Sequence, residues 1–195
     1  RPSLHIMGDE VWMPFPTALH AMNSARVRQF DPWFEEPAQL PANVQAFLED
    51  GPPPLYVGLW SHKPPAGSID LMVDAANRSG MRLIAQGKAT PPPNSHDFLW
   101  IEQPLSHRAL FPLCACIVHH GGAGTTISAT ASGRPQVVVP VMADQFFQAR
   151  LIQQHRLGTS LANVEFNGDL AARAIQAAIA ESDSESRERL AAACR

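Results

Sequence analysis

The sequence has little of several features that would assign a protein to a class at once. It holds 3 cysteines among 195 residues, and an odd number makes a poor disulfide framework. The net charge of -3 gives no electrostatic reason to expect binding to nucleic acid or to an anionic membrane. No apolar run is long enough to span a bilayer, and the start, RPSLHIMGDE, lacks the apolar core of a signal peptide. We therefore expect a globular protein of the cytoplasm.

The cysteines do not form a metal-binding pattern. Cys114 and Cys116 are separated by one residue in LCACIV, and we expect their side chains on opposite faces of the sheet. Buried thiols in a reducing compartment are the simplest interpretation. A metal site would need further ligands at suitable spacing, and the sequence shows none.

The first 54 residues differ in composition from the remainder. They are rich in proline and aromatic residues, as in WMPFP, DPWFEEP and GPPP, and show little periodicity. We interpret residues 1–54 as an interdomain linker and covering segment, with one short helix near PANVQAFLED. Residues 55–195 are the predicted domain.

From residue 55 onward, short apolar runs alternate with helical patterns. The runs are LYVGL, MRLIA, FLWI, ACIV and QVVVPV. The predicted helices are SIDLMVDAANRSG, TTISATASG ending at Gly133, FFQARLIQQHRLG closed by Gly158, and DLAARAIQAAIAES capped by Asn167 or Asp169. This alternation is typical of α/β proteins, so we predict a Rossmann-like, doubly wound parallel sheet. In such sheets ligands bind beyond the carboxyl ends of the strands, here after Leu59, Ile101, Val118 and Val141.

The motif HHGGAGTT, residues 119–126, follows one of these strands and opens a helix. Its glycines let the backbone approach a ligand, and its helix start offers free N–H groups and a favourable dipole to an anion. His119 and His120 add side-chain donors. These features indicate a phosphate or diphosphate site. The alternative is a tight strand–helix turn with one histidine satisfied in the core.

The motif MADQ follows the next strand. Asp144 and Gln145 can accept from and donate to neighbouring hydroxyl groups, which is the chemistry needed to hold a sugar ring. The alternative is that Asp144 caps the helix that follows. The sequence leaves both open.

The segment LFPLCACIVHHGGAGTTISATASGRPQVVVPVMADQFFQARLI resembles the donor-binding signature of nucleotide-sugar-dependent glycosyltransferases of the GT-B fold. The strongest resemblance is to sterol glucosyltransferases and related antibiotic and macrolide glycosyltransferases. It implies that this chain is one half of a GT-B fold, with the N-terminal acceptor domain absent. The resemblance assigns roles in donor binding to Ser61, Leu105, His119, Gly122, Ala123, Gly124, Thr125, Asp144 and Gln145.

Within that resemblance, His119 matches the histidine that contacts the diphosphate, and residues 122–125 match the phosphate loop. Asp144 and Gln145 match the pair that bonds to sugar hydroxyls. Leu105 marks the contact between backbone and base, and Ser61 lies near the phosphates. The sequence departs from the family at Trp60, which replaces a small residue. Trp100 is either the residue that stacks on the base or a core residue.

The resemblance implies an inverting transfer of a hexose, with glucose from UDP-glucose as the expected donor, to a hydroxyl of a lipophilic acceptor such as a sterol. No metal and no cofactor are expected, and no catalytic residue is expected in this chain because the general base belongs to the other half. The expected partners are the nucleotide sugar, the acceptor through the missing domain and a membrane surface for the longer protein. The alternatives are a UDP-sugar epimerase and a catalytically degenerate binding module or partner subunit.

Overall fold

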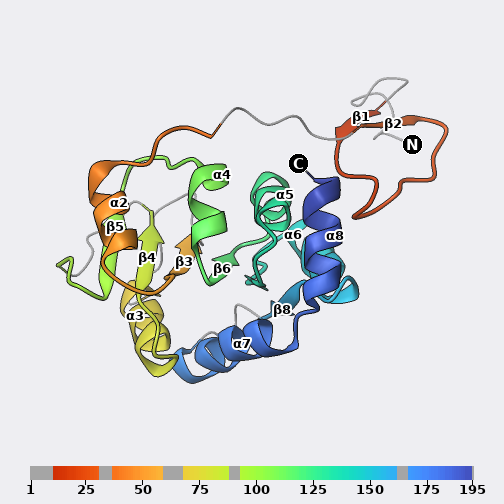
Figure 1. Ribbon diagram of the computed structural model, residues 1–195. Helices are drawn as coiled ribbons and strands as arrows, with labels where there is room; N and C mark the ends of the chain where they lie inside the picture. Colours follow the sequence, from red (N-terminus) through yellow and green to blue (C-terminus); the bar gives the residue numbers. More distant parts are fainter. Residues whose placement is uncertain (1–10, 31–36, 59–67, 88–92, 162–166, 195) are drawn as a thin grey trace.

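The computed structural model describes residues 11–30, 37–58, 68–87, 93–161 and 167–194. Its core is a six-stranded parallel sheet with helices on both faces, as Figure 1 shows. The strands are β3 (Leu55–Gly58), β4 (Leu83–Gln86), β5 (Phe98–Ile101), β6 (Cys116–His119), β7 (Gln136–Val138) and β8 (Gly158–Ser160). The predicted doubly wound α/β fold is confirmed.

The sheet has the strand order β5-β4-β3-β6-β7-β8. From β3 the chain adds β4 and then β5 on one side of the sheet. It then returns to the centre at β6 and adds β7 and β8 on the other side. At the centre, Leu55 of β3 pairs with Leu83 of β4 and with Cys116 of β6. In open α/β sheets, the crevice beyond the carboxyl ends at such a reversal is where ligands bind.

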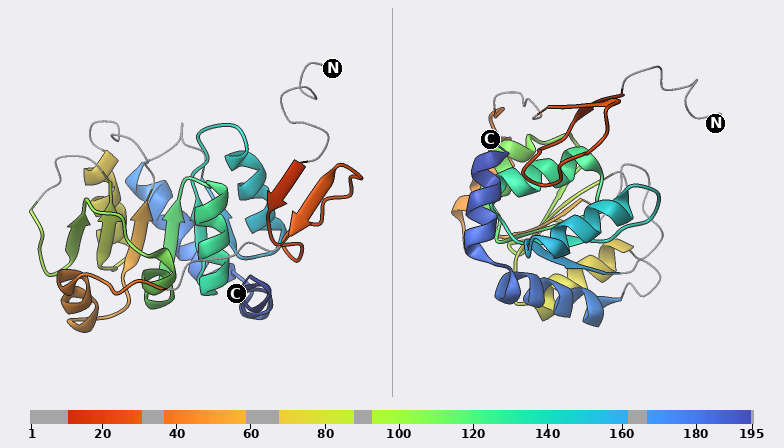
Figure 2. Two further views of the ribbon diagram at one scale, coloured as in Figure 1. Left: turned by 90° about the horizontal axis from the view of Figure 1, so that it is seen from above. Right: turned by 90° about the vertical axis from the view of Figure 1, so that its right-hand side faces the viewer.

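Helices cover both faces of the sheet (Figures 1 and 2). They are α2 (Ala42–Glu49), α3 (Ser68–Arg78), α4 (His107–Leu110), the 3-10 helix η1 (Phe111–Leu113), α5 (Ala123–Ser132), α6 (Gln145–Gln154), α7 (Gly168–Glu181) and α8 (Ser184–Ala193). The apolar side chains of α3 and α7 share one cluster with Leu55 and Val57 of β3, whereas α2 and α4 share another with Tyr56. This alternation is the period of two expected of a strand.

The two cysteines near β6 lie on opposite faces of the sheet, but alternation along a strand is not the reason, because residues two positions apart in one strand share a face. Cys116 belongs to the cluster under α3 and α7, and Cys114 to the cluster under α2 and α4, although Cys114 precedes β6 rather than lying in it. Both thiols are free and buried, and burial raises the pKa of each to about 12. They are therefore packing residues that stay protonated at neutral pH.

Several element boundaries differ from the prediction. The helix α6 ends at Gln154, and Gly158 begins β8 rather than closing that helix. A Cβ atom at Gly158 would lie 1.8 Å from the carbonyl oxygen of Gln136, so the close strand contact requires glycine. Asn167, and not Asp169, caps α7, because its side chain accepts from the N–H of Leu170.

Two features near the chain ends were not predicted. A parallel pair, β1 (Val11–Pro14) and β2 (Val27–Phe30), lies at the edge of the molecule (Figure 2). Phe15 and Leu19, close to this pair, are buried in a cluster with side chains of α6 and with Leu190 of α8. None of the described helices is long and apolar enough to cross a membrane.

Candidate functional site

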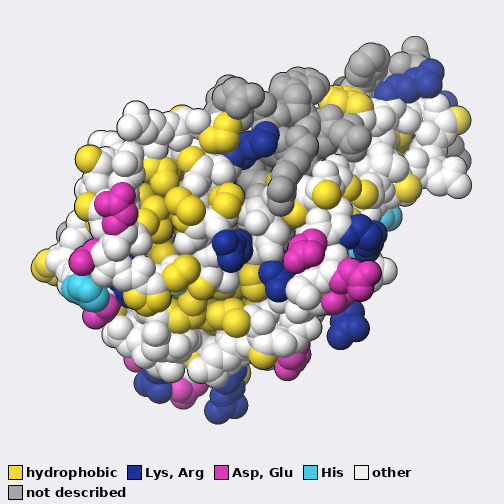
Figure 3. Space-filling view, viewed as in Figure 1, with side chains coloured by type: hydrophobic (Ala, Val, Ile, Leu, Met, Phe, Trp, Pro, Cys, Tyr) yellow, Lys and Arg dark blue, Asp and Glu magenta, His cyan; other side chains and the backbone are white. Residues whose placement is uncertain are grey.

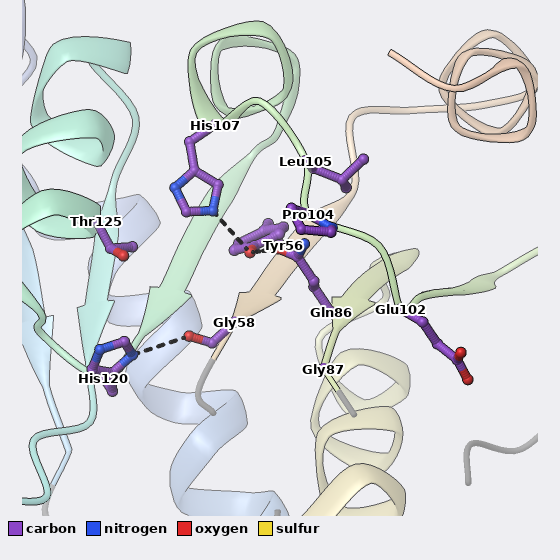
Figure 4. A pocket seen from close by; sticks show the side chains of 10 residues that line it. All are labelled: Tyr56, Gly58, Gln86, Gly87, Glu102, Pro104, Leu105, His107, His120 and Thr125. Atoms are coloured by element: carbon purple, nitrogen blue, oxygen red, sulfur yellow. Dashed lines mark hydrogen bonds between the residues drawn. The ribbon is translucent and has the colours of Figure 1, made fainter. Parts of the chain in front are cut away.

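A pocket of about 340 Å³ opens at the carboxyl ends of the central strands. It is bordered by the end of β3, the end of β4, the loop after β5 and the segment that joins β6 to α5, so four separate chain segments meet there (Figure 4). The residues that line it are Tyr56, Gly58, Gln86, Gly87, Glu102, Pro104, Leu105, His107, His120 and Thr125. The pocket therefore occupies the place where the strand order reverses.

The loop between β6 and α5 is compact because of its glycines. Gly121 has a φ of +89°, and a Cβ atom there would lie 2.8 Å from Cγ1 of Val138 and 3.1 Å from the carbonyl oxygen of Gln145. Both the backbone conformation and the close packing therefore require glycine. A Cβ atom at Gly122 would lie 2.6 Å from Nε2 of His120, so this glycine leaves space for the imidazole ring.

The first turn of α5 borders the pocket. Gly122 is the N-cap residue and supplies no side-chain cap, so the first N–H groups of α5 are not satisfied by a capping side chain. Thr125 lines the pocket, whereas the hydroxyl of Thr126 donates to the carbonyl oxygen of Gly122 at 3.0 Å. A Cβ atom at Gly124 would meet no heavy atom within 4 Å, so packing does not require glycine there. The helix start carries partial positive charge toward the pocket.

His119 is a buried structural residue. Its side chain is 0% exposed; its Nδ1 accepts from the N–H of Gly121 at 3.1 Å, and its Nε2 lies 3.0 Å from Oε1 of Gln136. The amide of Gln136 in turn donates to Oγ1 of Thr130 at 3.1 Å. These bonds select the neutral tautomer with hydrogen on Nε2, and burial lowers the pKa of His119 to about 4. Both ring nitrogens are therefore occupied within the protein.

His120 is the histidine that faces the pocket. Its ring is half-buried and lies beside Gly58, with Nδ1 3.5 Å from that carbonyl oxygen (Figure 4). The role predicted for His119 as the diphosphate contact is not favoured by this geometry, because His119 has no ring nitrogen left for a ligand. The arrangement fits the alternative of one histidine satisfied in the core, with its neighbour free to face the pocket.

The opposite wall of the pocket is a neutral hydrogen-bonded group. The hydroxyl of Tyr56 donates to Oε1 of Gln86 at 2.7 Å, and Nε2 of Gln86 donates to the carbonyl oxygen of Gln103 at 2.7 Å. His107 places Nε2 3.4 Å from the Tyr56 hydroxyl and stacks on Phe111 with ring centroids 4.3 Å apart. Burial lowers the pKa of His107 to about 4 and raises the pKa of Tyr56. These side chains are therefore uncharged at neutral pH, although the acidic residue Glu102 also lines this side of the pocket.

The structure places the other predicted residues as follows. Leu105 lines the pocket in the loop after β5. Trp100 is 7% exposed and packs in the cluster under α3 and α7, which confirms its interpretation as a core residue. Ser61 and Trp60 lie outside the described residues. Of the predicted set, Thr125 and Leu105 therefore line the pocket, whereas the lining does not include His119, Gly122, Ala123, Gly124, Asp144 and Gln145.

Asp144 and Gln145 stand at the start of α6, next to the loop that contains Gly121. Asp144 occupies the N-cap position, is exposed, and makes no side-chain cap hydrogen bond, so the helix-cap alternative is not supported. Oε1 of Gln145 accepts from the backbone N–H groups of Val141 at 2.8 Å and Met142 at 3.1 Å. Because a Cβ at Gly121 would touch the Gln145 backbone, the two loops are in contact.

The sequence reasoning missed the neutral wall of the pocket. Tyr56, Gln86, Gly87 and His107 all line the pocket. Gln86 and Gly87 could have been found by applying the strand-end rule to MRLIA as well, since they follow that strand directly. Tyr56 and His107 carried no local signal.

Among the described residues, no three His, Cys, Asp or Glu side chains are grouped so that they could hold a metal ion.

The chain matches a known family over more than half of its length. The family model described as erythromycin biosynthesis protein CIII-like, C-terminal domain, covers residues 89–193. Vancomycin aglycone glucosyltransferase of Amycolatopsis orientalis is 37% identical over 124 residues, which are 62% of this chain and 30% of that protein. Sterol 3-beta-glucosyltransferase UGT80A2 of Arabidopsis thaliana is 32% identical over 128 residues, which are 62% of this chain and 20% of that protein.

Solved structures show the same fold. Spinosyn forosaminyltransferase SpnP superposes with a TM-score of 0.73 at 20% identity, over 95% of this chain and 50% of that protein. A glycotransferase of kitacinnamycin gives a TM-score of 0.72 at 16% identity, over 97% of this chain and 51% of that protein. The chain thus spans about half the length of these structures and about a third or less of the two curated relatives.

Proposed function

Because the chain belongs to the family of erythromycin biosynthesis protein CIII-like C-terminal domains, the donor-binding domains of GT-B glycosyltransferases, we propose that it holds UDP-glucose for an inverting transfer of glucose. The observation that carries the proposal is the pocket at the strand reversal, where the start of α5, Thr125 and His120 face one another across a glycine loop. The acceptor is a hydroxyl group of a lipophilic molecule such as a sterol.

The diphosphate binds at the start of α5. The first N–H groups of this helix supply hydrogen-bond donors, and the helix dipole favours the negative charge. Thr125 adds a hydroxyl and His120 adds a ring N–H. Gly124 is exposed and is not required by packing, so its lack of a side chain serves close approach of the phosphates to the backbone.

The nucleoside binds against the neutral wall. The uncharged side chains of Tyr56, Gln86 and His107, together with half-buried Leu105, form a surface suited to a flat, neutral base and a ribose. A wall of lysine or arginine side chains would instead favour a second phosphate. We therefore expect the bound donor to lie with its base near the ends of β4 and β5 and its diphosphate at the start of α5.

The glucose binds beside the exposed carboxylate of Asp144. This side chain has no cap hydrogen bond to lose and lies on the loop in contact with Gly121. Two relatives support glucose as the sugar, since the vancomycin aglycone and sterol enzymes are both glucosyltransferases by name. The second of these supports a lipophilic acceptor.

During transfer, an acceptor hydroxyl attacks the anomeric carbon from the side opposite the nucleotide, and the bond from that carbon to the diphosphate breaks. The charge that develops on the departing diphosphate is stabilised by the α5 N–H groups and His120. The hydroxyl proton passes to a general base, which we place on a part of the protein outside this chain. General-base catalysis of this kind raises the rate roughly a hundred- to ten-thousand-fold.

Calorimetric titration of the chain with UDP, TDP and UDP-glucose tests the proposal. We expect UDP and UDP-glucose to bind, and His120→Ala to weaken both by about 1.5–3 kcal/mol, the range for a hydrogen bond to a charged group. Gly124→Ala should abolish most of the binding while leaving the fold intact or slightly more stable, because alanine is the better helix residue by about 1 kcal/mol.

The matched control is His96→Ala, which removes an exposed histidine whose ring interacts with Asp50 and Asp97, away from the pocket. It should bind UDP as the unaltered chain does. If no nucleotide binds, or if Gly124→Ala and His120→Ala both retain full affinity, the diphosphate site is not where we propose.

A further inference from the structure

A continuous series of hydrogen bonds crosses the interior of the domain from the loop after β6 to α5. It begins at Gly121, whose backbone N–H donates to Nδ1 of His119 at 3.1 Å. Nε2 of His119 lies 3.0 Å from Oε1 of Gln136, the first residue of β7, and Nε2 of Gln136 donates to Oγ1 of Thr130 at 3.1 Å. Since Thr130 belongs to α5, buried side chains join three elements, β6, β7 and α5.

The same series returns to the loop from which it starts. The hydroxyl of Thr130 donates to the carbonyl oxygen of Thr126 at 2.9 Å, and the hydroxyl of Thr126 donates to the carbonyl oxygen of Gly122 at 3.0 Å. The loop is therefore held from the interior at the N–H of Gly121 and at the C=O of Gly122. We call this series the interior network; its members are Gly121, His119, Gln136, Thr130, Thr126 and Gly122.

The side chains of the interior network leave one arrangement for their hydrogens. Because Nδ1 of His119 accepts, Nε2 carries the proton and needs an acceptor, which is Oε1 of Gln136. The amide of Gln136 then directs its N–H to Thr130, whose hydroxyl donates in turn to a backbone carbonyl. Turning the amide by 180° would bring two N–H donors together. The donors therefore all point the same way along the network, so that its bonds strengthen one another.

The interior network consists of neutral groups. The charged side chains that Figure 3 shows lie on the surface of the molecule, whereas the four side chains of the network are 0–2% exposed. Its strength therefore comes from the complete pairing of buried polar groups and not from ion pairs. A group that loses its partner in such surroundings carries the full cost of its desolvation, so the loss of one member disturbs its neighbours.

We propose that Gln136 is a positioning residue for the diphosphate of the donor. The residues that line the pocket do not include it, so it acts through other groups. By holding both His119 and Thr130, it fixes the segment Gly121–Gly122, which leads into the free N–H groups at the start of α5. The inference rests on the proposed function and refines it: the interior network sets the direction in which these donors face the phosphates.

Two substitutions of Thr130 test the proposal with little change in shape. Thr130→Val keeps the branched side chain but removes the hydroxyl, so that the amide N–H of Gln136 loses its acceptor. Thr130→Ser keeps the hydroxyl. The matched control is Thr159→Val, because the hydroxyl of Thr159 in β8 also donates to a helix carbonyl, that of Ala174 at 3.1 Å, and Thr159 does not line the pocket.

The affinity of each variant for UDP is measured by calorimetry, its stability by thermal unfolding, and its amide hydrogen exchange without ligand. We expect Thr130→Val to lower the affinity for UDP about threefold to tenfold, the scale of one lost neutral hydrogen bond. Thr130→Ser and Thr159→Val should stay within about twofold of the unaltered chain, although Thr159→Val loses stability. Exchange at the amides of residues 121 and 122 should be faster in Thr130→Val than in Thr159→Val.

A double variant tests whether Thr130 acts through Gln136. Gln136→Met keeps the length of the side chain but removes both of its hydrogen bonds, so it should lower the affinity for UDP at least as much as Thr130→Val. If the two residues act in one series, adding Thr130→Val to Gln136→Met should lower the affinity by no more than about a further twofold. Losses that multiply would overturn this order of action. If Gln136→Met does not fold, the two Thr130 variants decide the question.

The proposal is overturned if Thr130→Val binds UDP as tightly as Thr159→Val does, because the interior network would then serve stability alone. It is also overturned if Thr130→Ser loses as much affinity as Thr130→Val, since the hydroxyl would then not be the group that matters. An unaltered chain that binds no UDP would refute the proposed function and the diphosphate role together. The exchange at residues 121 and 122, which needs no ligand, would still decide whether the network holds the loop.

Discussion

The loops that follow β6 and β7 are neighbours in the sheet, yet they are stabilised in opposite ways. The loop after β6 is anchored in the interior: His119 is fully buried, bonded at both ring nitrogens, and Gly121 is packed against Val138. The loop after β7 is exposed and is held by the side chain of Gln145. The comparison indicates that the proposed phosphate site is preorganised by the core, whereas the proposed sugar site depends on a few surface hydrogen bonds.

We expect the largest loss of stability from Gly121→Ala, which places a methyl group in the contact between the two loops. The added Cβ would lie 2.8 Å from Cγ1 of Val138, and the backbone would keep a φ of +89° that alanine disfavours. We expect a loss of about 3–5 kcal/mol in the free energy of unfolding, from strain and overpacking together. Urea denaturation measures it, and a loss below about 1 kcal/mol, the ordinary range for a tolerated substitution, would contradict the tight contact.

A somewhat smaller loss of stability is expected from His119→Ala. The substitution leaves a cavity and removes the partner of both the Gly121 N–H and the Gln136 side chain. We expect about 2–3 kcal/mol of destabilisation, since buried polar groups would be left unpaired. His120→Ala, one residue later, should change stability by less than about 0.5 kcal/mol, as expected for a site away from the core. Equal destabilisation by the two would break the comparison between a structural and a pocket-facing histidine.

The stability of the protein should depend on pH because His119 is buried in its neutral form. The unfolded chain takes up a proton at His119 near pH 6.5, whereas the folded protein, with the pKa of His119 lowered to about 4, does not. The unfolded state therefore binds more protons between these values, and stability falls as the pH decreases through that window.

The variant His119→Asn provides the reference for this pH effect. Between pH 7 and pH 4.5 the unaltered chain should lose about 2 kcal/mol more stability than His119→Asn, in which this proton uptake is absent. His107, which has a similarly lowered pKa, is present in both proteins and cancels in the difference. Denaturation midpoints at the two pH values measure the effect, and parallel losses would show that His119 titrates normally.

The smallest change in stability is expected in the exposed loop. Asp144 makes no cap hydrogen bond, so Asp144→Ala should alter the free energy of unfolding by less than about 0.5 kcal/mol, compared with about 1 kcal/mol for the loss of a true N-cap. The same substitution should weaken UDP-glucose and leave UDP binding unchanged. A melting curve and two titrations test this, and equal weakening of both ligands would place Asp144 at the phosphates instead.

Much of the domain could be predicted from the sequence because its strands are short, apolar and bounded by turns. The five predicted runs correspond to β3 through β7, and HHGGAGTT follows β6 and leads into α5 as expected. The edge strand β8 has no apolar run, and α8 has a largely polar sequence with Leu190 and Ala191 as its buried residues. These two elements are set by tertiary contacts rather than by local pattern.

Strand alternation explains why His119 is buried and His120 faces the pocket. The motif HHGGAGTT by itself does not distinguish the two histidines. In β6, Cys116 and Val118 belong to the cluster under α3 and α7, whereas Ile117 belongs to the other face. His119 therefore follows Ile117 in pointing to the face covered by α5, where it is buried, and His120 emerges beyond the strand. The Tyr56, Gln86 and His107 wall, in contrast, joins segments up to 51 positions apart and has no local signature.

The central pairing of β3 with β6 has a consequence for the order of events in folding. Leu55 pairs in register with Cys116, and the roughly sixty residues between them must fold back before the pair forms. The pocket lies across this junction, so it does not exist in any intermediate that contains only one side of the sheet. A nucleotide that binds there should consequently retard unfolding of the finished domain without accelerating its formation, because the ligand has nothing to hold until the junction has closed.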